Sequence, residues 1–472
     1  MRKTKIVCTL GPSTDDYKVL KELVRSGMNV ARLNMSHGSH AEHRARMEAI
    51  RRVRKELGVP LAILLDTKGP EIRVKTFKDG SVDLKDGKIF TLTTREVEGD
   101  ETEVSVSYEL LPGCVSEGDV ILLNDGMIEL CVDKVTDTDI ACKVVHGGVL
   151  SNRKSINLPG REIDMPYLSD ADRDDLRFAV EEDVDYIALS FVRTSDDVRQ
   201  AKNFISMCGG DNIQLISKIE NRQGVDNARE ILELSDGIMV ARGDMGVEIP
   251  FEELPNIQKT LIKNCYKIGK KVITATQMLE SMISSPRPTR AEISDVANAI
   301  YDGTSAIMLS GETAAGKYPV EAVRTMAKIA EKTEGCINFK KRFQAHEYTI
   351  KSITDAVSQA TCASAFDLNA KAIITVSQSG YTARKVSRFR PECVIIAATT
   401  SEKVYNQLAL NWGVLPTMAL VQKTPDALFS HAAKCALNTG AVHEGDLAVL
   451  TGSSEVGKAG NSNTMRIEYL HY

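Results

Sequence analysis

The feature that most constrains the fold is an alternation of short apolar segments with helical segments, repeated eight times along the chain. The predicted strands cover residues 7–9, 30–33, 61–65, 186–190, 213–218, 238–241, 272–276 and 306–310. Eight strand–helix units over about 250 residues predict a closed (β/α)8 barrel rather than an open doubly wound sheet. In such barrels the active site lies at the carboxyl ends of the strands.

The alternation is interrupted once, by residues 75–158, whose segments are short, alternating and rich in Val, Thr and Ile. Turn signals such as Lys78-Asp79-Gly80 separate these segments, as in β-hairpins. We therefore expect an inserted all-β domain over 71–167 that acts as a lid on the barrel, with hinges near 69–70 and 159–160.

The rest of the chain divides around this insertion. The barrel domain would take residues 1–70 and 168–337, in line with a length that predicts about three domains. A polar stretch at 338–349 would link it to a smaller α/β domain over 350–472. The last strand of that domain, 464–469, should pair antiparallel with its predecessor.

Composition indicates a cytoplasmic protein without a nucleic-acid or membrane partner. Charged residues make up 26% and hydrophobic residues 43% of the chain, and the net charge is -5. Ten cysteines are scattered without a CxxC pair, which is typical of reduced thiols in the cytosol. The first apolar run ends at Gly11-Pro12, too early for a signal-peptide core, and no segment is long enough to span a bilayer.

Residues 213–247 contain two of the predicted strands, joined by a helical segment at 221–234. The first strand ends in Lys218 and Glu220, and the second ends in Arg242 and Asp244. Neighbouring parallel strands end at the same edge of a sheet, so these side chains should meet. Two carboxylates suit Mg²⁺ or Mn²⁺. Taken alone, the segment is equally compatible with two surface salt bridges.

Other predicted strand ends are also polar and should converge on the same mouth of the barrel. They are Arg32 and Asn34, Asp66 and Lys68, Thr276 and Gln277, and Ser310 and Glu312.

Two loops, 311–317 and 452–458, match the phosphate-loop pattern GxxxxGK, but Tyr318 and Ala459 replace the Ser or Thr that must reach Mg²⁺. We reject both as nucleotide-hydrolysis loops, although the second could cradle a phosphate with Lys458. His37, His40 and His43 form a cluster that indicates a solvated helix start rather than a zinc site, because no fourth ligand is near in sequence.

Seven blocks of the sequence, running in order through all three predicted domains, resemble the signature blocks of the pyruvate kinase family. They are ARLNMSHG (31–38), LLDTKGPEIR (64–73), SINLPG (155–160), SKIEN (217–221), MVARGDMGVEIP (239–250), ATQMLESM (275–282) and MLSGETAAGKYP (308–319).

The resemblance implies transfer of the phosphoryl group of phosphoenolpyruvate to ADP, giving pyruvate and ATP in the last step of glycolysis. By similarity, Glu220 and Asp244 bind Mg²⁺ or Mn²⁺, and Lys218 neutralises the charge of the travelling phosphoryl group. Backbone N–H groups of Gly243 and Asp244 would hold the substrate carboxylate beside the Thr276 hydroxyl.

The same resemblance places cations around the phosphates. Arg32 and Arg73 would contact the transferred phosphoryl group with forked donors. Arg73, Lys154, His37 and Asn34 are expected at the nucleotide, and for Lys154 a surface salt bridge stays an open alternative.

A potassium site is implied by Asn34, Ser36, Asp66 and Thr67, which resemble the K⁺ ligands of the family. Glu71 matches the K⁺-dependent members, whereas K⁺-independent members tend to carry a lysine there. The resemblance therefore predicts dependence on K⁺.

Protonation of the enolate and regulation are less defined. Thr276 has too high a pKa to donate a proton alone, so we expect a water chain that includes Ser310 and Glu312. A phosphorylated effector would rest on Ser377, Ser379, Gly380 and Thr382. Residues 452–463 lack the tryptophan and arginine of animal fructose-1,6-bisphosphate sites, so fructose-1,6-bisphosphate, AMP and a sugar monophosphate all stay open.

A homotetramer is implied by the resemblance alone. Two other functions compete with the kinase. A metal-dependent aldolase or lyase barrel would not need the lid, Lys154 or the K⁺ ligands. A catalytically silent sensor would be expected to have lost some of Lys218, Glu220, Asp244 or Arg73, and the sequence has all four.

Overall fold

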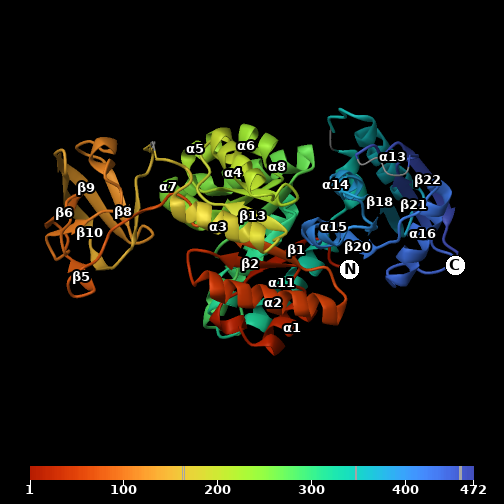
Figure 1. Ribbon diagram of the computed structural model, residues 1–472, viewed down its shortest axis with the longest axis horizontal. Helices are drawn as coiled ribbons and strands as arrows, with labels where there is room; N and C mark the ends of the chain where they lie inside the picture. Colours follow the sequence, from red (N-terminus) through yellow and green to blue (C-terminus); the bar gives the residue numbers. More distant parts are fainter. Residues whose placement is uncertain (162, 164, 346–347, 456–459, 472) are drawn as a thin grey trace.

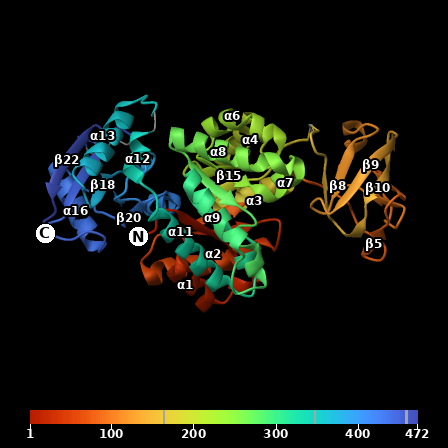
Figure 2. The same ribbon diagram turned by 180° about the vertical axis from the view of Figure 1, so that it is seen from behind.

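The computed structural model describes residues 1–161, 163, 165–345, 348–455 and 460–471. Three parts lie in a row, with a β lid at one end, a barrel in the middle and an α/β unit at the other end (Figure 1). The view from behind shows the same order, and the N-terminus lies beside the α/β unit (Figure 2).

The barrel consists of eight parallel strands in the closed order β1-β17-β16-β15-β14-β13-β3-β2, which confirms the predicted (β/α)8 architecture. These strands are β1 (Lys5–Thr9), β2 (Val30–Asn34), β3 (Ala62–Asp66), β13 (Tyr186–Leu189), β14 (Gln214–Ile219), β15 (Gly237–Ala241), β16 (Lys271–Ala275) and β17 (Ala306–Leu309).

Helices surround the barrel because its strands are apolar on both faces and must be covered on the outside. They are α1 (Tyr17–Ser26), α2 (His40–Leu57), α3 (Asp170–Glu181), α4 (Ser195–Met207), α5 (Arg222–Asp226), α6 (Ala228–Leu234), α7 (Arg242–Glu248), α8 (Leu254–Ile268), α9 (Arg290–Asp302), α10 (Gly311–Ala314) and α11 (Pro319–Glu334). Short 3-10 helices cover Pro12–Thr14, Leu111–Cys114, Phe251–Glu253, Glu280–Ile283 and Leu408–Leu410.

The barrel interior is a packed apolar core that also includes two residues of the C-terminal unit. Ala409 and Leu410 belong to the same buried cluster as Val7, Tyr186 and Met308. The Tyr186 hydroxyl donates to the carbonyl of Gln407 from the same segment. The C-terminal unit therefore closes the floor of the barrel and leaves the strand carboxyl ends free to form the site.

Two local predictions in the barrel were wrong. The segment 221–234 is not one helix but α5 and α6, which break at Asn227, whose side chain donates to the carbonyl of Arg193 at 3.0 Å. The sequence analysis treated Arg242 and Asp244 as a strand end, but both lie in a helix, α7, that begins at Arg242 directly after β15.

The lid is a seven-stranded sheet of order β4-β12-β8-β9-β10-β6-β7 with a two-stranded sheet β11-β5, and it has its own apolar core. Its strands are β4 (Ile72–Arg73), β5 (Ser81–Leu84), β6 (Ile89–Thr93), β7 (Glu103–Ser105), β8 (Val120–Leu123), β9 (Ile128–Val135), β10 (Asp139–His146), β11 (Gly148–Ser151) and β12 (Ser155–Asn157). Between β8 and β9, Asn124, Asp125 and Gly126 all have positive φ, as a tight turn of these residue types requires.

The C-terminal unit is a five-stranded sheet of order β20-β19-β18-β21-β22. Its last strand pairs antiparallel with β21, as predicted. The elements are α13 (Ile353–Asp367), β18 (Ala372–Val376), α14 (Tyr381–Ser387), β19 (Val394–Thr399), α15 (Glu402–Gln407), β20 (Val414–Met418), α16 (Pro425–Asn438), β21 (Leu447–Gly452) and β22 (Thr464–Tyr469).

The stretch predicted as a polar linker contains a helix, α12 (Phe339–Gln344). Phe339 and Phe343 explain the difference, because they pack against Trp412 and Phe366. Within the described ranges, no helix is long and apolar enough to cross a membrane.

Candidate active site

The ammonium group of Lys218 lies at the centre of a buried ionic cluster at the carboxyl ends of β3, β13 and β14. Its Nζ is 2.9 Å from Glu220 Oε1 and 3.3 Å from Asp66 Oδ1, and it donates to Ser190 Oγ at 2.8 Å. Asp66 and Glu220 are fully buried and Lys218 is 8% exposed. Side chains from the ends of β3, β13 and β14 therefore meet at one edge of the barrel.

The charges of this cluster stabilise one another unequally. Burial disfavours the ammonium form of Lys218, but the attraction of Asp66 and Glu220 outweighs the effect of burial. The pKa of Lys218 therefore lies above its ordinary value. Burial raises the pKa of Glu220 to about 8 despite Lys218, and repulsion from Asp244 acts in the same direction. Lys218 is thus a permanent cation. A second cation beside Glu220 would stabilise the carboxylate form of that residue.

Arg32 extends the cluster from β2. Its Nε donates to Asp66 Oδ2 at 2.6 Å, and its Nη1 donates to Thr9 Oγ1 at 2.8 Å. Burial would raise the pKa of Asp66, but Arg32 and Lys218 outweigh burial and hold that pKa below its usual range.

The Glu220 carboxylate fits a divalent metal. Its Oε2 accepts from the Phe191 N–H at 2.6 Å, and its buried Oε1 lies 2.9 Å from the Lys218 ammonium nitrogen. Asp244 lies in the first turn of α7. Among the described residues there is no group of three or more His, Cys, Asp and Glu side chains that could hold a metal. Mg²⁺, however, is often bound by only one or two carboxylates of the protein.

The four residues expected to bind K⁺ lie at or just after the carboxyl ends of the neighbouring strands β2 and β3. Asn34 stands opposite Asp66 in the parallel register of β2 and β3. Asn34 Oδ1 accepts from the Ser36 N–H at 3.1 Å, and the Thr67 carbonyl accepts from Ser190 Oγ at 2.6 Å. These neutral and anionic oxygens are the ligand type that a hard cation prefers.

A strained turn follows β16, where Thr276 and Gln277 have φ values of 69° and 54°. Thr276 Oγ1 accepts from the Gly243 N–H at 2.7 Å and donates to the Ala275 carbonyl at 2.6 Å. The structure thus brings Thr276 and Gly243 together, as expected. The Gly243 N–H is engaged by Thr276, so a substrate carboxylate would have to share or replace this bond.

Arg242 does not join the cluster, although the sequence placed it at the mouth. Its Nη2 donates to the Thr276 carbonyl at 2.7 Å, and its guanidinium pairs with Asp295 of α9 at 2.7 Å. Arg242 therefore supports the turn that carries Thr276.

Ser310 and Glu312, at the end of β17, differ in their surroundings. The fully buried Glu312 carboxylate accepts from the N–H groups of Leu279 at 3.0 Å and Ser310 at 2.7 Å. Ser310 Oγ is buried and has no hydrogen-bond partner among the residues that the structure describes. The Ser310 hydroxyl is therefore able to contact a water molecule or a substrate. Glu312 connects two loops through the N–H groups of Leu279 and Ser310.

Comparison with known proteins identifies the family of this chain. The model described as "Pyruvate kinase, barrel domain" matches residues 1–323, and "Pyruvate kinase, alpha/beta domain" matches residues 355–468. Proteins named pyruvate kinase from Staphylococcus saprophyticus and Staphylococcus epidermidis are 49% identical, and one from Staphylococcus aureus is 48% identical. Each match covers 100% of this chain and 81% of the relative.

The chain belongs to the pyruvate kinase family. Members are phosphotransferases, and the resemblance seen in the sequence blocks is confirmed.

Two residues that the family resemblance places at the phosphates, Arg73 and Lys154, belong to the lid. Arg73 donates through Nε and Nη2 to Glu71 Oε2 at 2.9 and 2.6 Å, and through Nη1 to the Arg153 carbonyl at 2.9 Å. Lys154 is half-buried, and its carbonyl accepts from the Val74 N–H at 2.9 Å. The structure places both residues on the edge of the lid formed by β4 and β12.

His37 lies on the barrel side of the mouth and is exposed, and its carbonyl oxygen accepts from the Nε2–H group of His43 at 2.8 Å. His40 stacks on Phe178 and pairs with Asp175 at 2.6 Å. Nε2 of His43 and Nε2 of His40 are thus engaged by the His37 carbonyl and by Asp175 respectively.

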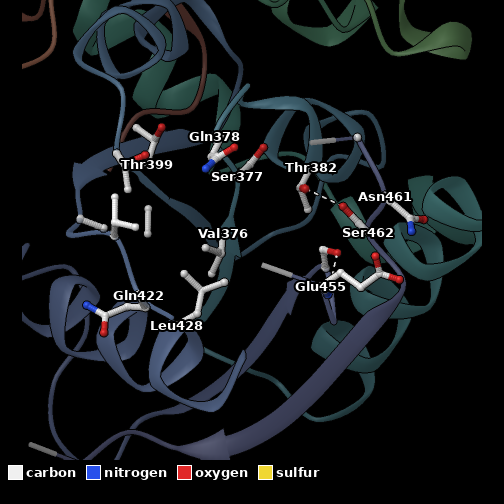
Figure 3. A pocket seen from close by; sticks show the side chains of 16 residues that line it. Val376, Ser377, Gln378, Thr382, Thr399, Gln422, Leu428, Glu455, Asn461 and Ser462 are labelled. Atoms are coloured by element: carbon white, nitrogen blue, oxygen red, sulfur yellow. Dashed lines mark hydrogen bonds between the residues drawn. The ribbon is translucent and has the colours of Figure 1, made fainter. Parts of the chain in front are cut away.

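The expected effector cradle coincides only partly with a cavity of about 70 Å³ in the C-terminal unit (Figure 3). Ser377 and Thr382 line it, whereas Ser379 and Gly380 are not among its described lining residues. The Ser379 carbonyl accepts from Arg384 at 2.8 Å, and Gly380 has a φ of 70° before α14. The predicted contact of Lys458 lies outside the described residues.

Two polar strand ends were missed in the sequence, Thr9 of β1 and Ser190 after β13. Each contacts a predicted site residue, because Thr9 accepts from Arg32 and Ser190 accepts from Lys218. Applying the strand-end rule to all eight strands would have found them.

Proposed function

We propose that this chain transfers the phosphoryl group of phosphoenolpyruvate to ADP, giving pyruvate and ATP, at the mouth of the barrel. The observation that carries the proposal is the buried ionic cluster of Lys218, Glu220 and Asp66 at the strand ends of a chain that belongs to the pyruvate kinase family.

Lys218 and Arg32 would neutralise the phosphoryl group in transfer. A loose phosphoryl transfer spreads charge over three oxygens, and the protein helps mainly through fixed cations in a dry site. Lys218 supports this role by its burial and its permanent charge. Arg32 adds a forked donor that is held by Asp66 and Thr9.

Glu220 and Asp244 would hold Mg²⁺ or Mn²⁺, and Asn34, Ser36, Asp66 and Thr67 would hold K⁺. When bound, these cations balance the negative charge of the substrates and help to orient them. The chain contributes the oxygen ligands, and the Phe191 N–H fixes the rotamer of Glu220.

The substrate carboxylate would bind the N–H groups of Gly243 and Asp244 beside Thr276. After transfer, a proton must reach the enolate carbon. Two features support a water chain in this region: Thr276 accepts from the Gly243 N–H, and the Ser310 hydroxyl has no partner within the described part of the chain. Glu312 would act by holding the Ser310 N–H.

The nucleotide would bind between the lid and the barrel, with Arg73 and Lys154 on one side and Asn34 and His37 on the other. Closure of the lid about 69–70 and 159–160 would bring these groups together. Arg73 would then exchange Glu71 for phosphate oxygens.

The remaining expectations are proposals of the same kind. They are domain boundaries at 1–70 with 168–337, 71–167 and 350–472, a homotetramer, a cytoplasmic location, and a phosphorylated effector in the cavity near Ser377 and Thr382. The identity of that effector stays open among fructose-1,6-bisphosphate, AMP and a sugar monophosphate.

A steady-state assay of pyruvate release tests the proposed function. Pyruvate should appear only when phosphoenolpyruvate, ADP and Mg²⁺ are all present, and replacing K⁺ by a large organic cation should slow it. Absence of pyruvate under every condition, with each candidate effector added, would restore the aldolase and sensor alternatives.

A further inference from the structure

Ser190, at the end of β13, links groups that the sequence assigns to different cations. Its Oγ accepts from Lys218 Nζ at 2.8 Å and lies 2.6 Å from the Thr67 carbonyl oxygen. Its N–H donates to Thr67 Oγ1 at 3.2 Å, and the residue is 1% exposed. The serine is thus buried between the phosphoryl-neutralising lysine and an expected K⁺ ligand.

The direction of these bonds follows from the chemistry of a hydroxyl group, which has one proton and two lone pairs. The proton points to the Thr67 carbonyl, because Asp66 Oδ1 is farther away at 3.2 Å. The lone pairs then face Lys218, whose ammonium can only donate. Ser190 therefore fixes Lys218 by an oriented bond that Asp66 and Glu220 do not replace.

The next residue makes the same turn rigid. Phe191 has a φ of 52°, and its N–H donates to Glu220 Oε2 at 2.6 Å. The turn also touches the lid hinge, since a Cβ atom on Gly69 would lie 2.9 Å from Ser190 and 3.2 Å from Phe191. The two residues of this turn, Ser190 and Phe191, thereby contact Lys218, Glu220 and the expected hinge residue Gly69.

We propose that Ser190 is a positioning residue that couples the Lys218 ammonium to the K⁺ site. The inference rests on the function proposed above. A carbonyl oxygen has two lone pairs, so Thr67 can accept from Ser190 and still ligate a cation. Without the hydroxyl, Lys218 is left to Glu220 and Asp66, and a shift toward Asp66 brings positive charge closer to the K⁺ ligands.

The test compares Ser190→Ala with Ser190→Thr, which keeps the hydroxyl, and with Ser217→Ala as a matched control. Ser217 is a buried serine of the neighbouring strand whose hydroxyl pairs with Ser235 at 2.7 Å instead of with Lys218. The half-saturating K⁺ concentration for activity is measured for each variant. Binding of Tl⁺, a K⁺ analogue, is measured by equilibrium dialysis without turnover, and Mn²⁺ binding is measured by electron paramagnetic resonance.

Ser190→Ala should raise the half-saturating K⁺ concentration and weaken Tl⁺ binding about tenfold, as loss of a hydrogen bond to a charged group would. Mn²⁺ binding should change little, because Phe191 still supports Glu220. Ser190→Thr and Ser217→Ala should resemble the wild type. If the alanine variant does not fold, Ser190→Cys serves the same purpose, because a thiol is a weak donor and acceptor.

The inference would be overturned if Ser190→Ala had the same half-saturating K⁺ concentration and the same Tl⁺ affinity as the wild type. It would also be overturned if Ser217→Ala lost as much Tl⁺ affinity as Ser190→Ala. A wild type that releases no pyruvate with K⁺ would instead overturn the proposed function. In that case Tl⁺ binding still decides whether Ser190 shapes a cation site.

Discussion

Glu71 and Arg73, two residues apart at the start of the lid, form an ion pair in which both Nε and Nη2 of Arg73 donate to one oxygen of Glu71. Burial raises the pKa of Glu71 even though Arg73 opposes this. The pair therefore occupies two nitrogens of the arginine that the proposed function assigns to phosphate.

Replacing Glu71 by lysine should reduce the dependence on K⁺. The new ammonium group would supply positive charge near the mouth, and Arg73 would lose its partner. A K⁺ titration of pyruvate release should show a smaller ratio between activity with K⁺ and activity with an organic cation. Glu71→Gln is the control, since it frees Arg73 without adding a cation, and it should keep the K⁺ requirement. An unchanged ratio in Glu71→Lys would contradict this role of Glu71.

Thr276→Val should slow turnover about 10²-fold, the lower end of the contribution of a positioned proton-transfer group. Valine keeps the shape of threonine but cannot accept from the Gly243 N–H. Exchange of the pyruvate methyl protons in heavy water, followed by NMR, should slow in parallel, whereas Thr276→Ser should retain both activities. Normal exchange in Thr276→Val would show that its hydroxyl is not involved in delivering the proton.

Gly69→Ala should impair closure of the lid. Gly69 has a φ of 74°, and an added Cβ would lie 2.9 Å from the Cβ and carbonyl oxygen of Ser190. Gly80→Ala is a matched control in the lid, with a φ of 79° and no neighbour within 4 Å of the added atom. We expect a rise in the KM for ADP in Gly69→Ala beyond that of Gly80→Ala. Equal kinetics in the two variants would mean that only backbone strain matters.

Lys271, on the floor of the barrel, should make thermal stability depend on pH. Burial lowers the pKa of this lysine to about 7, and its Nζ donates to Gln214 at 2.6 Å. The unfolded chain keeps the lysine protonated to a higher pH, so between about pH 7 and pH 10 the unfolded state binds more protons and stability rises with pH.

Lys271→Met should flatten this rise, as measured by calorimetric melting at several pH values. Lys267→Met, at an exposed lysine of α8, is the control and should keep the slope of the wild type. Identical slopes for Lys271→Met and the wild type would show that Lys271 does not titrate in this range.

The barrel could be predicted because its strands are buried on both faces and read as continuous apolar runs, unlike the alternating strands of the lid. The meeting of Lys218 with Glu220 follows from the two-residue period of a strand, which puts both side chains on the same side at the end of β14. The direction of Arg242 could not be predicted, because its partner Asp295 is 53 residues away and only the fold brings them together. The helix at Phe339 was missed for the same reason, since its aromatic partners come from the C-terminal unit.

The central claim is that Lys218 neutralises a phosphoryl group moving from phosphoenolpyruvate to ADP. The most direct measurement follows ATP formation by phosphorus NMR for the wild type, Lys218→Met and the control Lys267→Met, with Mn²⁺ binding measured in parallel. The account predicts that Lys218→Met lowers the rate about 10³-fold, while the protein still folds and the control stays active. ATP formation by Lys218→Met at the rate of the wild type would contradict it.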